Sequence, residues 1–215
     1  MSRKKLSKFL AIRKMLNVIE SHKSIYNNIK GKWHEFFGNN NPIILELGCG
    51  YGDYTIGLAN KFTDKNYIGI DIKGERLWAG ADLALKNKLS NVVFLQSEIY
   101  NLQYFFRAGE VSEIWITFPD PQKEKPTKRL TTSIYLNIYK QVLKSNGAIH
   151  LKTDSDLIFD YTLDVLDNFN IKDLIFTKNL YNSEFKALHQ GIKTGFEKVY
   201  LEQGKTIKYL SFRFN

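Results

Sequence analysis

A chain of 215 residues is long enough for one α/β domain with a sizeable core and too short for two enzymatic domains. Its 43% apolar and 25% charged residues exclude a disordered or collagen-like protein, and the absence of a long apolar run or signal core predicts a cytoplasmic protein without a membrane partner. The formal charge of +9 favours a polyanionic partner, whereas one cysteine and four histidines without ligand spacing exclude an internal disulfide and predict no metal site.

The first predicted unit is a basic N-terminal arm, residues 1–34. Within residues 1–32, nine Lys and Arg stand against one acid, Glu20, so this stretch carries +8 of the +9 charge. Apolar side chains recur at helical spacing from Leu6 to Ile19, which predicts an amphipathic helix. Its charge suits nucleic acid, because bound cations release condensed counterions, although a solubilising tail has the same composition.

A hinge-like GNNNP stretch at 38–42 leads into the second unit, a domain that covers residues 35–215. Strand and helix patterns alternate there, which predicts an α/β, Rossmann-like fold with a seven-stranded, mostly parallel sheet and helices on both faces. The predicted strands cover 43–47, 67–71, 92–96, 113–117, 148–153, 171–177 and 207–212. The predicted helices cover 53–61, 75–88, 100–106, 132–143, 156–168 and the region near 196–202.

A glycine-rich loop follows the first strand of this domain, in the sequence IILELGCGYGD. Gly48, Gly50 and Gly52 stand where a β-carbon would block a tight turn and the approach of a ligand to the backbone. Such a loop alone is also typical of a plain structural turn. The next strands supply context, because Asp71 ends the second strand, where it can accept both hydroxyls of a ribose, and Glu98 follows the third, where it can meet an adenine amine.

The choice between two cofactor classes rests on Glu46, which precedes the glycines. Nicotinamide dinucleotides and S-adenosylmethionine both fit a glycine loop followed by a strand-end acid. A carboxylate before the glycines suits a cationic aminoacyl sulfonium and repels a pyrophosphate, which needs a helix N-terminus and the longer GxGxxG spacing. The spacing here is GxGxG. The pattern favours S-adenosylmethionine, although an acid paired to a nearby cation could also stand at this position.

A proline-rich loop, TFPDPQKEKPTKRL, follows the fourth predicted strand. Ligands in open α/β sheets bind beyond the carboxyl ends of the strands, so Asp120 is expected to face the same crevice as the glycine loop. Pro119 and Pro121 stiffen the backbone on both sides of this carboxylate, although a plain turn capped by Asp120 is the alternative. The loop also carries cations suited to phosphates, unless it is merely solvated: Lys123, Lys125, Lys128 and Arg129.

Together these motifs resemble the bacterial tRNA (guanine-N7-)-methyltransferase family. The likeness spans about residues 35–212 and rests on LELGCGYGD, the strand end YIGID, TFPDP followed by KR, HLKTD at 150–154 and TGFEKVYLEQGKTIKYL at 194–210. It implies a class I methyltransferase fold, S-adenosylmethionine as methyl donor and tRNA as partner. The implied product is 7-methylguanosine at guanosine 46 of the variable loop. A monomer and a homodimer both remain compatible with the sequence.

The resemblance also implies roles for individual residues, with Asp120 in the catalytic position. Cofactor contacts are implied for the strand-end acids and the loop glycines: Glu46, Asp71, Glu98, Asp120, Gly48, Gly50 and Gly52. Substrate contacts are implied for the basic loop, the KTD element and the T-x-[FY]-E element: Glu124, Lys125, Lys128, Arg129, Lys152, Asp154, Thr194 and Glu197. The chain departs from the family pattern at Gln122, where many members have Trp, at Glu98, where Asp is usual, and in a shorter basic loop.

The implied reaction requires positioning rather than a general base, because guanine N7 carries a lone pair and no proton. A carboxylate of Asp120 or Asp154 that accepts hydrogen bonds from the ring N1–H and the exocyclic amine would identify guanine and stabilise the charge that develops in the ring. Adenine lacks this pair of donors. Two other classes remain compatible with the sequence: a methyltransferase for a protein or small molecule, and a non-catalytic RNA-binding module.

Overall fold

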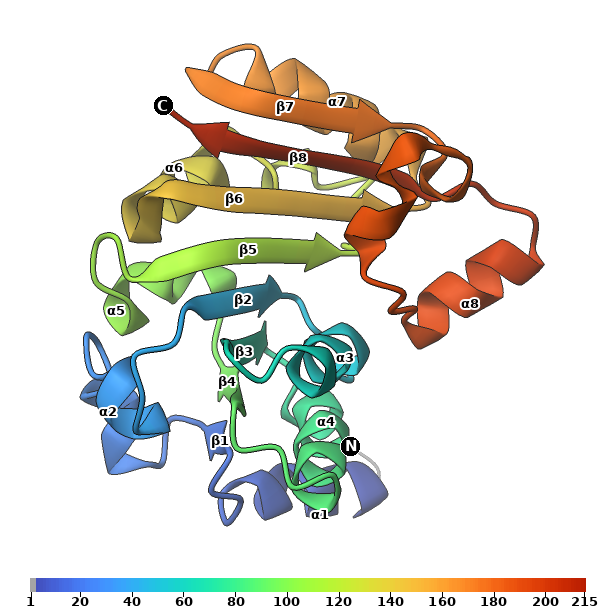
Figure 1. Ribbon diagram of the computed structural model, residues 1–215. Coiled ribbons are helices and arrows are strands. Elements are labelled where there is room, and N and C mark those ends of the chain that lie inside the picture. The colour runs from blue at the N-terminus through green and yellow to red at the C-terminus, as the bar shows by residue number, and fades with distance from the viewer. Residues whose placement is uncertain (1–2) are drawn as a thin grey trace.

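The computed structural model describes residues 3–215, with side chains from residue 6 onward. These residues contain an eight-stranded sheet in the order β1-β4-β3-β2-β5-β6-β8-β7 (Figure 1). Neighbouring strands from β1 to β6 are parallel, and β8 is antiparallel to β6 and β7. The strands are β1 (Val18–Ile19), β2 (Ile43–Leu47), β3 (Asn66–Asp71), β4 (Val92–Gln96), β5 (Val111–Thr117), β6 (Leu143–Thr153), β7 (Ile171–Thr177) and β8 (Lys208–Phe214). The direction of winding reverses between β2 and β5, so a ligand crevice is expected at their carboxyl ends.

Helices cover both faces of this sheet, as the alternating pattern predicts. They are α1 (Arg3–Ile12), α2 (Trp33–Phe37), α3 (Asp53–Lys61), α4 (Gly74–Lys86), α5 (Leu102–Phe105), α6 (Ser133–Val142), α7 (Asp156–Leu166) and α8 (Gly195–Glu202), with short 3-10 helices η1 (Ser24–Asn27), η2 (Ile99–Asn101), η3 (Pro126–Lys128), η4 (Leu180–Asn182) and η5 (Glu184–His189). A buried cluster with Trp33 and Phe159 lies on one face, and a cluster with Tyr54 and Leu77 lies on the other. Coverage on both faces explains why strands such as β2 are almost wholly apolar.

The structure confirms the seven predicted strands as β2 to β8 and corrects their number, because the described chain has an eighth strand, β1, in the N-terminal region. The helix predicted through Ile19 is correspondingly wrong beyond Ile12, where α1 ends. Val18 and Ile19 pair in parallel with Phe94 and Leu95 of β4. Both β-branched side chains are buried, on opposite faces of the sheet, so tertiary packing prevails over the helical spacing of the sequence.

The basic N-terminal region packs against the rest of the fold. Figure 1 shows α1 alongside α4 at the β1 edge of the sheet. Ile12 is fully buried there, and the Lys8 ammonium lies 4.5 Å from the centre of the Trp78 ring on α4. Further along, Ile29 and Trp33 are 1% and 0% exposed. Part of this cationic segment therefore contributes to the core that also supports the sheet.

The residues predicted for the site follow the carboxyl ends of the central strands, so they lie along one edge of the sheet. The glycine loop follows β2, Asp71 ends β3, the FPDP loop follows β5, and Asp154 follows β6. Figure 1 shows α8 beyond the arrowheads of β5 and β6, at this same edge. Segments far apart in the sequence meet there because parallel strands of a wound sheet all end on one side.

Candidate active site

The glycine loop turns sharply between β2 and α3. Gly48, Gly50 and Gly52 have φ angles of 72°, 57° and 78°, which side chains rarely adopt. A β-carbon on Gly52 would lie 2.6 Å from the ring of Phe94, so this position also requires glycine for packing. In contrast, a β-carbon on Gly50 would meet nothing within 4 Å. The backbone at Gly50 therefore faces open space at the carboxyl end of the sheet, as a loop that receives a ligand must.

The two acids predicted to contact the cofactor lie at or just beyond the carboxyl ends of β3 and β4. Asp71 is 8% exposed, and its Oδ2 accepts a hydrogen bond of 3.0 Å from the Gly50 amide. Its Oδ1 accepts a second hydrogen bond of 2.8 Å from the Lys73 amide. Glu98 is exposed at the start of η2. The structure therefore brings Asp71 directly to the glycine loop, whereas Glu98 is exposed beyond the end of β4.

Glu46 is a buried acid on β2, 3% exposed. Its Oε1 accepts a hydrogen bond of 2.6 Å from the Thr117 hydroxyl on β5. Its Oε2 accepts a hydrogen bond of 2.8 Å from the Thr55 amide on α3 and another from the Thr55 hydroxyl. Desolvation outweighs these hydrogen bonds and raises the pKa of Glu46 to about 7. The carboxyl group consequently binds a proton near neutrality and ties β2, β5 and α3 together.

We expect Glu46→Gln to remove part of the pH dependence of stability. The folded pKa of about 7 exceeds the ordinary value of 4.5, so the native state binds the extra proton and is destabilised as pH rises from 4.5 to about 7. As pH rises through that window, the unfolding free energy of the wild type should fall relative to that of the variant by on the order of 3 kcal/mol. Urea unfolding at several pH values measures this difference. If the unfolding free energies of the two proteins changed with pH in parallel, burial would not be raising the pKa of Glu46.

The FPDP loop is strained at both ends. Phe118 has a φ of 49° and Gln122 a φ of 46°, the left-handed region that bulky side chains avoid. The Phe118 amide is held by a 2.8 Å hydrogen bond to the Lys152 carbonyl, and Asp120 Oδ1 accepts a 2.9 Å hydrogen bond from the Gln122 amide. Asp120 itself is exposed. Backbone strain of this kind clusters at functional sites, and here it flanks an exposed carboxylate that follows the end of β5.

The basic loop after FPDP divides into exposed and buried cations. Lys123, Lys125 and Lys128 are exposed, as is Glu124. Arg129 is only 6% exposed, its Nε donates a 3.0 Å hydrogen bond to the Pro121 carbonyl, and its guanidinium lies 4.4 Å from the ring centre of Tyr161. Arg129 therefore ties the FPDP loop to the ring of Tyr161 on α7, whereas the three lysines are exposed to solvent.

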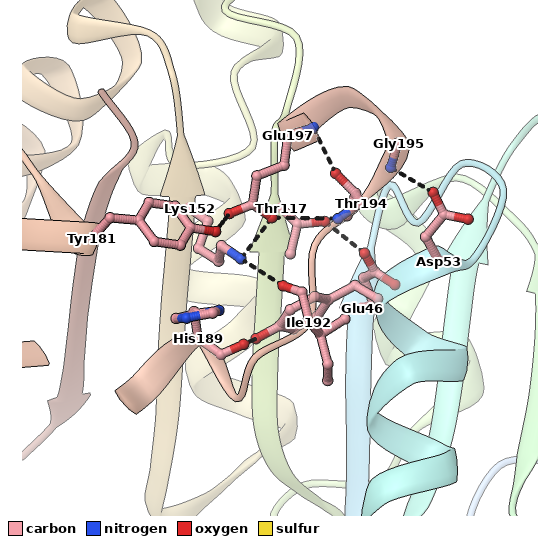
Figure 2. Close-up of polar contacts among 11 residues, drawn as sticks. Glu46, Asp53, Thr117, Lys152, Tyr181, His189, Ile192, Thr194, Gly195 and Glu197 are labelled. Carbon is pink, nitrogen blue, oxygen red and sulfur yellow. Dashed lines mark hydrogen bonds and ion pairs between the residues drawn. The ribbon is translucent and has the colours of Figure 1, made fainter. Parts of the chain in front are cut away.

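The KTD and T-x-[FY]-E elements meet in a buried ion pair (Figure 2). Lys152 Nζ on β6 lies 2.9 Å from Glu197 Oε2 on α8, and both side chains are 0% exposed. The Tyr181 hydroxyl donates a 2.8 Å hydrogen bond to Glu197 Oε1. Burial lowers the pKa of Lys152, and the neighbouring Glu197 carboxylate counters that shift. This pair joins α8 to the sheet within the protein interior.

Thr194 and Glu197 also start helix α8. The Glu197 amide donates a 3.1 Å hydrogen bond to the Thr194 hydroxyl, and the Thr194 amide donates a 3.3 Å hydrogen bond to Glu197 Oε2. This reciprocal arrangement is a capping box. Asp154 lies nearby at the end of β6, where its Oδ2 accepts a 2.7 Å hydrogen bond from Lys205 Nζ. In this structure, therefore, the carboxylates of Glu197 and Asp154 are both bound to lysines.

Sequence reasoning missed three side chains that complete the site. Thr55 and Thr117 hold Glu46, and Tyr181 holds Glu197. Thr117 directly precedes FPDP at a strand end, a position that could have drawn attention. Tyr181 belongs to a 3-10 helix outside every motif, so only the tertiary structure brings it to the site.

The described residues contain no group of three or more His, Cys, Asp or Glu side chains that could hold a metal ion. None of the described helices is long and apolar enough to cross a membrane.

Comparison with known proteins establishes the class. The structure is similar to the 16S rRNA methyltransferase KamB, with a TM-score of 0.65 and 13% identity over 86% of this chain and 93% of that one. It is also similar to an antibiotic-related methyltransferase, with a TM-score of 0.62 and 20% identity over 84% and 91% of the two chains. The family model described as a putative methyltransferase matches residues 40–210. By fold, the protein is a class I methyltransferase.

Relatives that match over the whole chain define the family. The tRNA (guanine-N(7)-)-methyltransferase of Cytophaga hutchinsonii is 48% identical over 100% of this chain and 99% of its own length. The enzyme of that name from Christiangramia forsetii is 49% identical over 99% and 98% of the two chains, and that from Listeria innocua is 32% identical over 92% and 94%. The chain belongs to the tRNA (guanine-N(7)-)-methyltransferase family, which confirms the resemblance seen in its motifs.

Proposed function

We propose that this protein transfers a methyl group from S-adenosylmethionine to N7 of a guanine in tRNA, guanosine 46 of the variable loop, in the cytoplasm. Family membership over the whole chain supports the proposal. The observation that carries it is the exposed Asp120 carboxylate, which a strained loop holds at the same sheet edge as the glycine loop. A methyl donor at the glycine loop and a guanine at Asp120 would therefore bind along the same edge of the sheet.

The residues at the glycine loop fit S-adenosylmethionine. Open space above the Gly50 backbone leaves room for the cofactor, and Asp71 lies at the loop, where it would accept hydrogen bonds from ribose hydroxyls. Glu98, exposed beyond the end of β4, would receive the adenine amine. Near Glu46, a cationic aminoacyl end would favour the ionised carboxylate and so release its proton. When bound, this cofactor supplies an electrophilic methyl group on a sulfonium.

Asp120 is better placed than Asp154 to recognise guanine. Its carboxylate is exposed and one oxygen is engaged by the backbone of its own turn, whereas the Asp154 carboxylate is bound to Lys205. In the proposed reaction, Asp120 accepts hydrogen bonds from guanine N1–H and the exocyclic amine. The negative charge then stabilises the positive charge that enters the ring as N7 is methylated. No residue has to remove a proton from N7.

The surface around this carboxylate suits the phosphates of tRNA. We assign phosphate contacts to the exposed lysines of the basic loop, Lys125 and Lys128, with Lys123 and Glu124 beside them. Arg129 stabilises the loop through its hydrogen bond to the Pro121 carbonyl. On the other side, the buried Lys152–Glu197 pair and the Thr194 cap hold α8 at the rim of the guanine side.

The product of the reaction tests this proposal. Purified protein is incubated with S-adenosylmethionine and tRNA transcripts that differ only by guanosine or adenosine at position 46, and the digested nucleosides are analysed by mass spectrometry. We expect 7-methylguanosine from the guanosine transcript alone. Methylation of both transcripts would contradict the position, and binding of tRNA without methylation would contradict the enzymatic role.

A further inference from the structure

Helix α3 contacts the segment of chain that leads into α8. We call residues 189–195 the bridging segment; it runs from the end of η5 to the first residue of α8. The Tyr54 hydroxyl donates a 3.4 Å hydrogen bond to the His189 carbonyl, and Lys61 Nζ donates one of 2.7 Å to the Gln190 carbonyl. Both donors lie on α3, so the start of the bridging segment rests along the length of the helix that follows the glycine loop.

Gly57 in the middle of α3 makes the closest part of this contact possible. Glycine is the least favourable ordinary residue in a helix interior, so its presence there calls for a packing reason. A β-carbon at Gly57 would lie 2.5 Å from Cγ2 and 3.1 Å from Cγ1 of Ile192. These atoms belong to a stiff β-branched side chain, which cannot simply swing away. The missing side chain at Gly57 therefore sets how closely the bridging segment approaches α3.

Asp53 holds the far end of the bridging segment. Its Oδ2 accepts a 2.8 Å hydrogen bond from the amide of Gly195, the first residue of α8 (Figure 2). Asp53 is also the first residue of α3 and directly follows Gly52 of the glycine loop. One hydrogen bond, between residues 142 apart in the sequence, therefore joins the start of α3 to the start of α8.

The same segment reaches the buried ion pair. The Ile192 carbonyl lies 3.4 Å from Lys152 Nζ, and Thr194 forms the capping box with Glu197 (Figure 2). The bridging segment therefore contacts both α3 and the residues that fix α8 on the sheet. A shift of Ile192 would be passed to the capping box two residues later.

We propose that α3 positions α8 through the bridging segment, and that Gly57 and Asp53 are positioning residues for methyl transfer. This inference rests on the proposed function, in which the glycine loop receives the methyl donor and α8 borders the guanine side. Transfer requires the two reactants at a set separation and in line, so a common support for both sides of the site matters for the rate. Cofactor affinity depends on the loop itself and does not need the bridging segment.

Four variants test the contact between Gly57 and Ile192: Gly57→Ala, Ile192→Ala, the double variant, and Asn60→Ala as a control at an exposed position of the same helix. Gly57→Ala should lower the single-turnover rate between about ten- and a hundredfold, the effect of a displacement near 1 Å. Its affinity for S-adenosylhomocysteine, measured by calorimetry, should stay within about twofold of wild type. The double variant should recover to the rate of Ile192→Ala, because the clashing atoms are gone.

A Gly57→Ala rate equal to that of Asn60→Ala, or a double variant as slow as Gly57→Ala, would overturn the positioning role. So would a loss of cofactor affinity that matches the loss of rate, because the change would then lie in the glycine loop. Hydrogen exchange separates this inference from the proposed function, since it needs no tRNA. The Gly195 amide should exchange faster in Gly57→Ala and in Asp53→Ala than in wild type or Asn60→Ala, and equal rates in all four proteins would overturn the bridging contact itself.

Discussion

Glu197→Ala is expected to lower the free energy of unfolding by about 3–5 kcal/mol, the cost of leaving a buried charge without its partner. The Lys152 ammonium is 0% exposed and lies 2.9 Å from the Glu197 carboxylate, so the variant would bury it unpaired. The same change removes half of the capping box of α8 and the acceptor for the Tyr181 hydroxyl. A loss of this size is a large share of the stability of a typical domain. Equilibrium unfolding in urea, followed by circular dichroism, measures it.

Two further variants identify the cause. Glu202→Ala removes an exposed acid from the end of the same helix and should change stability by no more than about 0.5 kcal/mol. Replacing the pair together, Lys152→Met with Glu197→Leu, should cost less than Glu197→Ala alone, because no buried charge remains. A Glu197→Ala variant within about 1 kcal/mol of wild type would show that the pair behaves as an exposed salt bridge, contrary to its burial.

Asp120→Asn should reduce the single-turnover rate of guanine methylation by roughly ten- to a hundredfold, which corresponds to losing a charge-assisted hydrogen bond. The amide keeps the size of the side chain but places a donor opposite the guanine donors, and it cannot stabilise the positive charge in the ring. Affinity for bulk tRNA should hold, because contacts to phosphates elsewhere supply most of it. Rapid-quench kinetics with saturating cofactor, together with filter binding of tRNA, separate the two effects.

The matched control for this charge change is Asp164→Asn, an exposed acid on α7, which should leave the rate unchanged. The wild-type rate should also be level through neutral pH, since the reaction removes no proton from N7. If Asp120→Asn kept full activity, the FPDP loop would be a purely structural turn. A rate that keeps rising through neutrality in both the wild type and Glu46→Gln would require a general base and so contradict the proposed role of the Asp120 carboxylate, because the variant lacks the group whose pKa is about 7.

The sequence was sufficient for the elements whose signals are local. The seven predicted strands, the glycine loop and the FPDP loop all occur in the structure, because strand periodicity and glycine or proline chemistry act within a few residues. The strand bounds were less well predicted, since β6 begins at Leu143 rather than at residue 148. The prediction was wrong for β1. The spacing of Ile19 fits a helix, but pairing with β4 and burial of Val18 and Ile19 stabilise an edge strand, and neither effect is visible in the local sequence.

The chemistry of the site was likewise only partly visible. The sequence by itself determined which residue types stand at the strand ends: Glu46 and Asp71 around the glycines, and Asp120 between two prolines. The tertiary structure decided how those groups are used, because burial and partners depend on segments far apart in the chain. It buries Glu46 between Thr117 and Thr55 and raises its pKa to about 7.

The same distinction, between local sequence signals and long-range contacts, applies to helix α8 and the motif at its start. The T-x-[FY]-E pattern determines a capping box locally, since a hydroxyl and a carboxylate three residues apart suit a helix start. That Glu197 also pairs with Lys152, and that α3 supports this helix through Asp53 and Gly57, follows from contacts across 45 to 142 residues of sequence. Desolvation and close packing arise only when those segments meet, so only the folded chain could decide them.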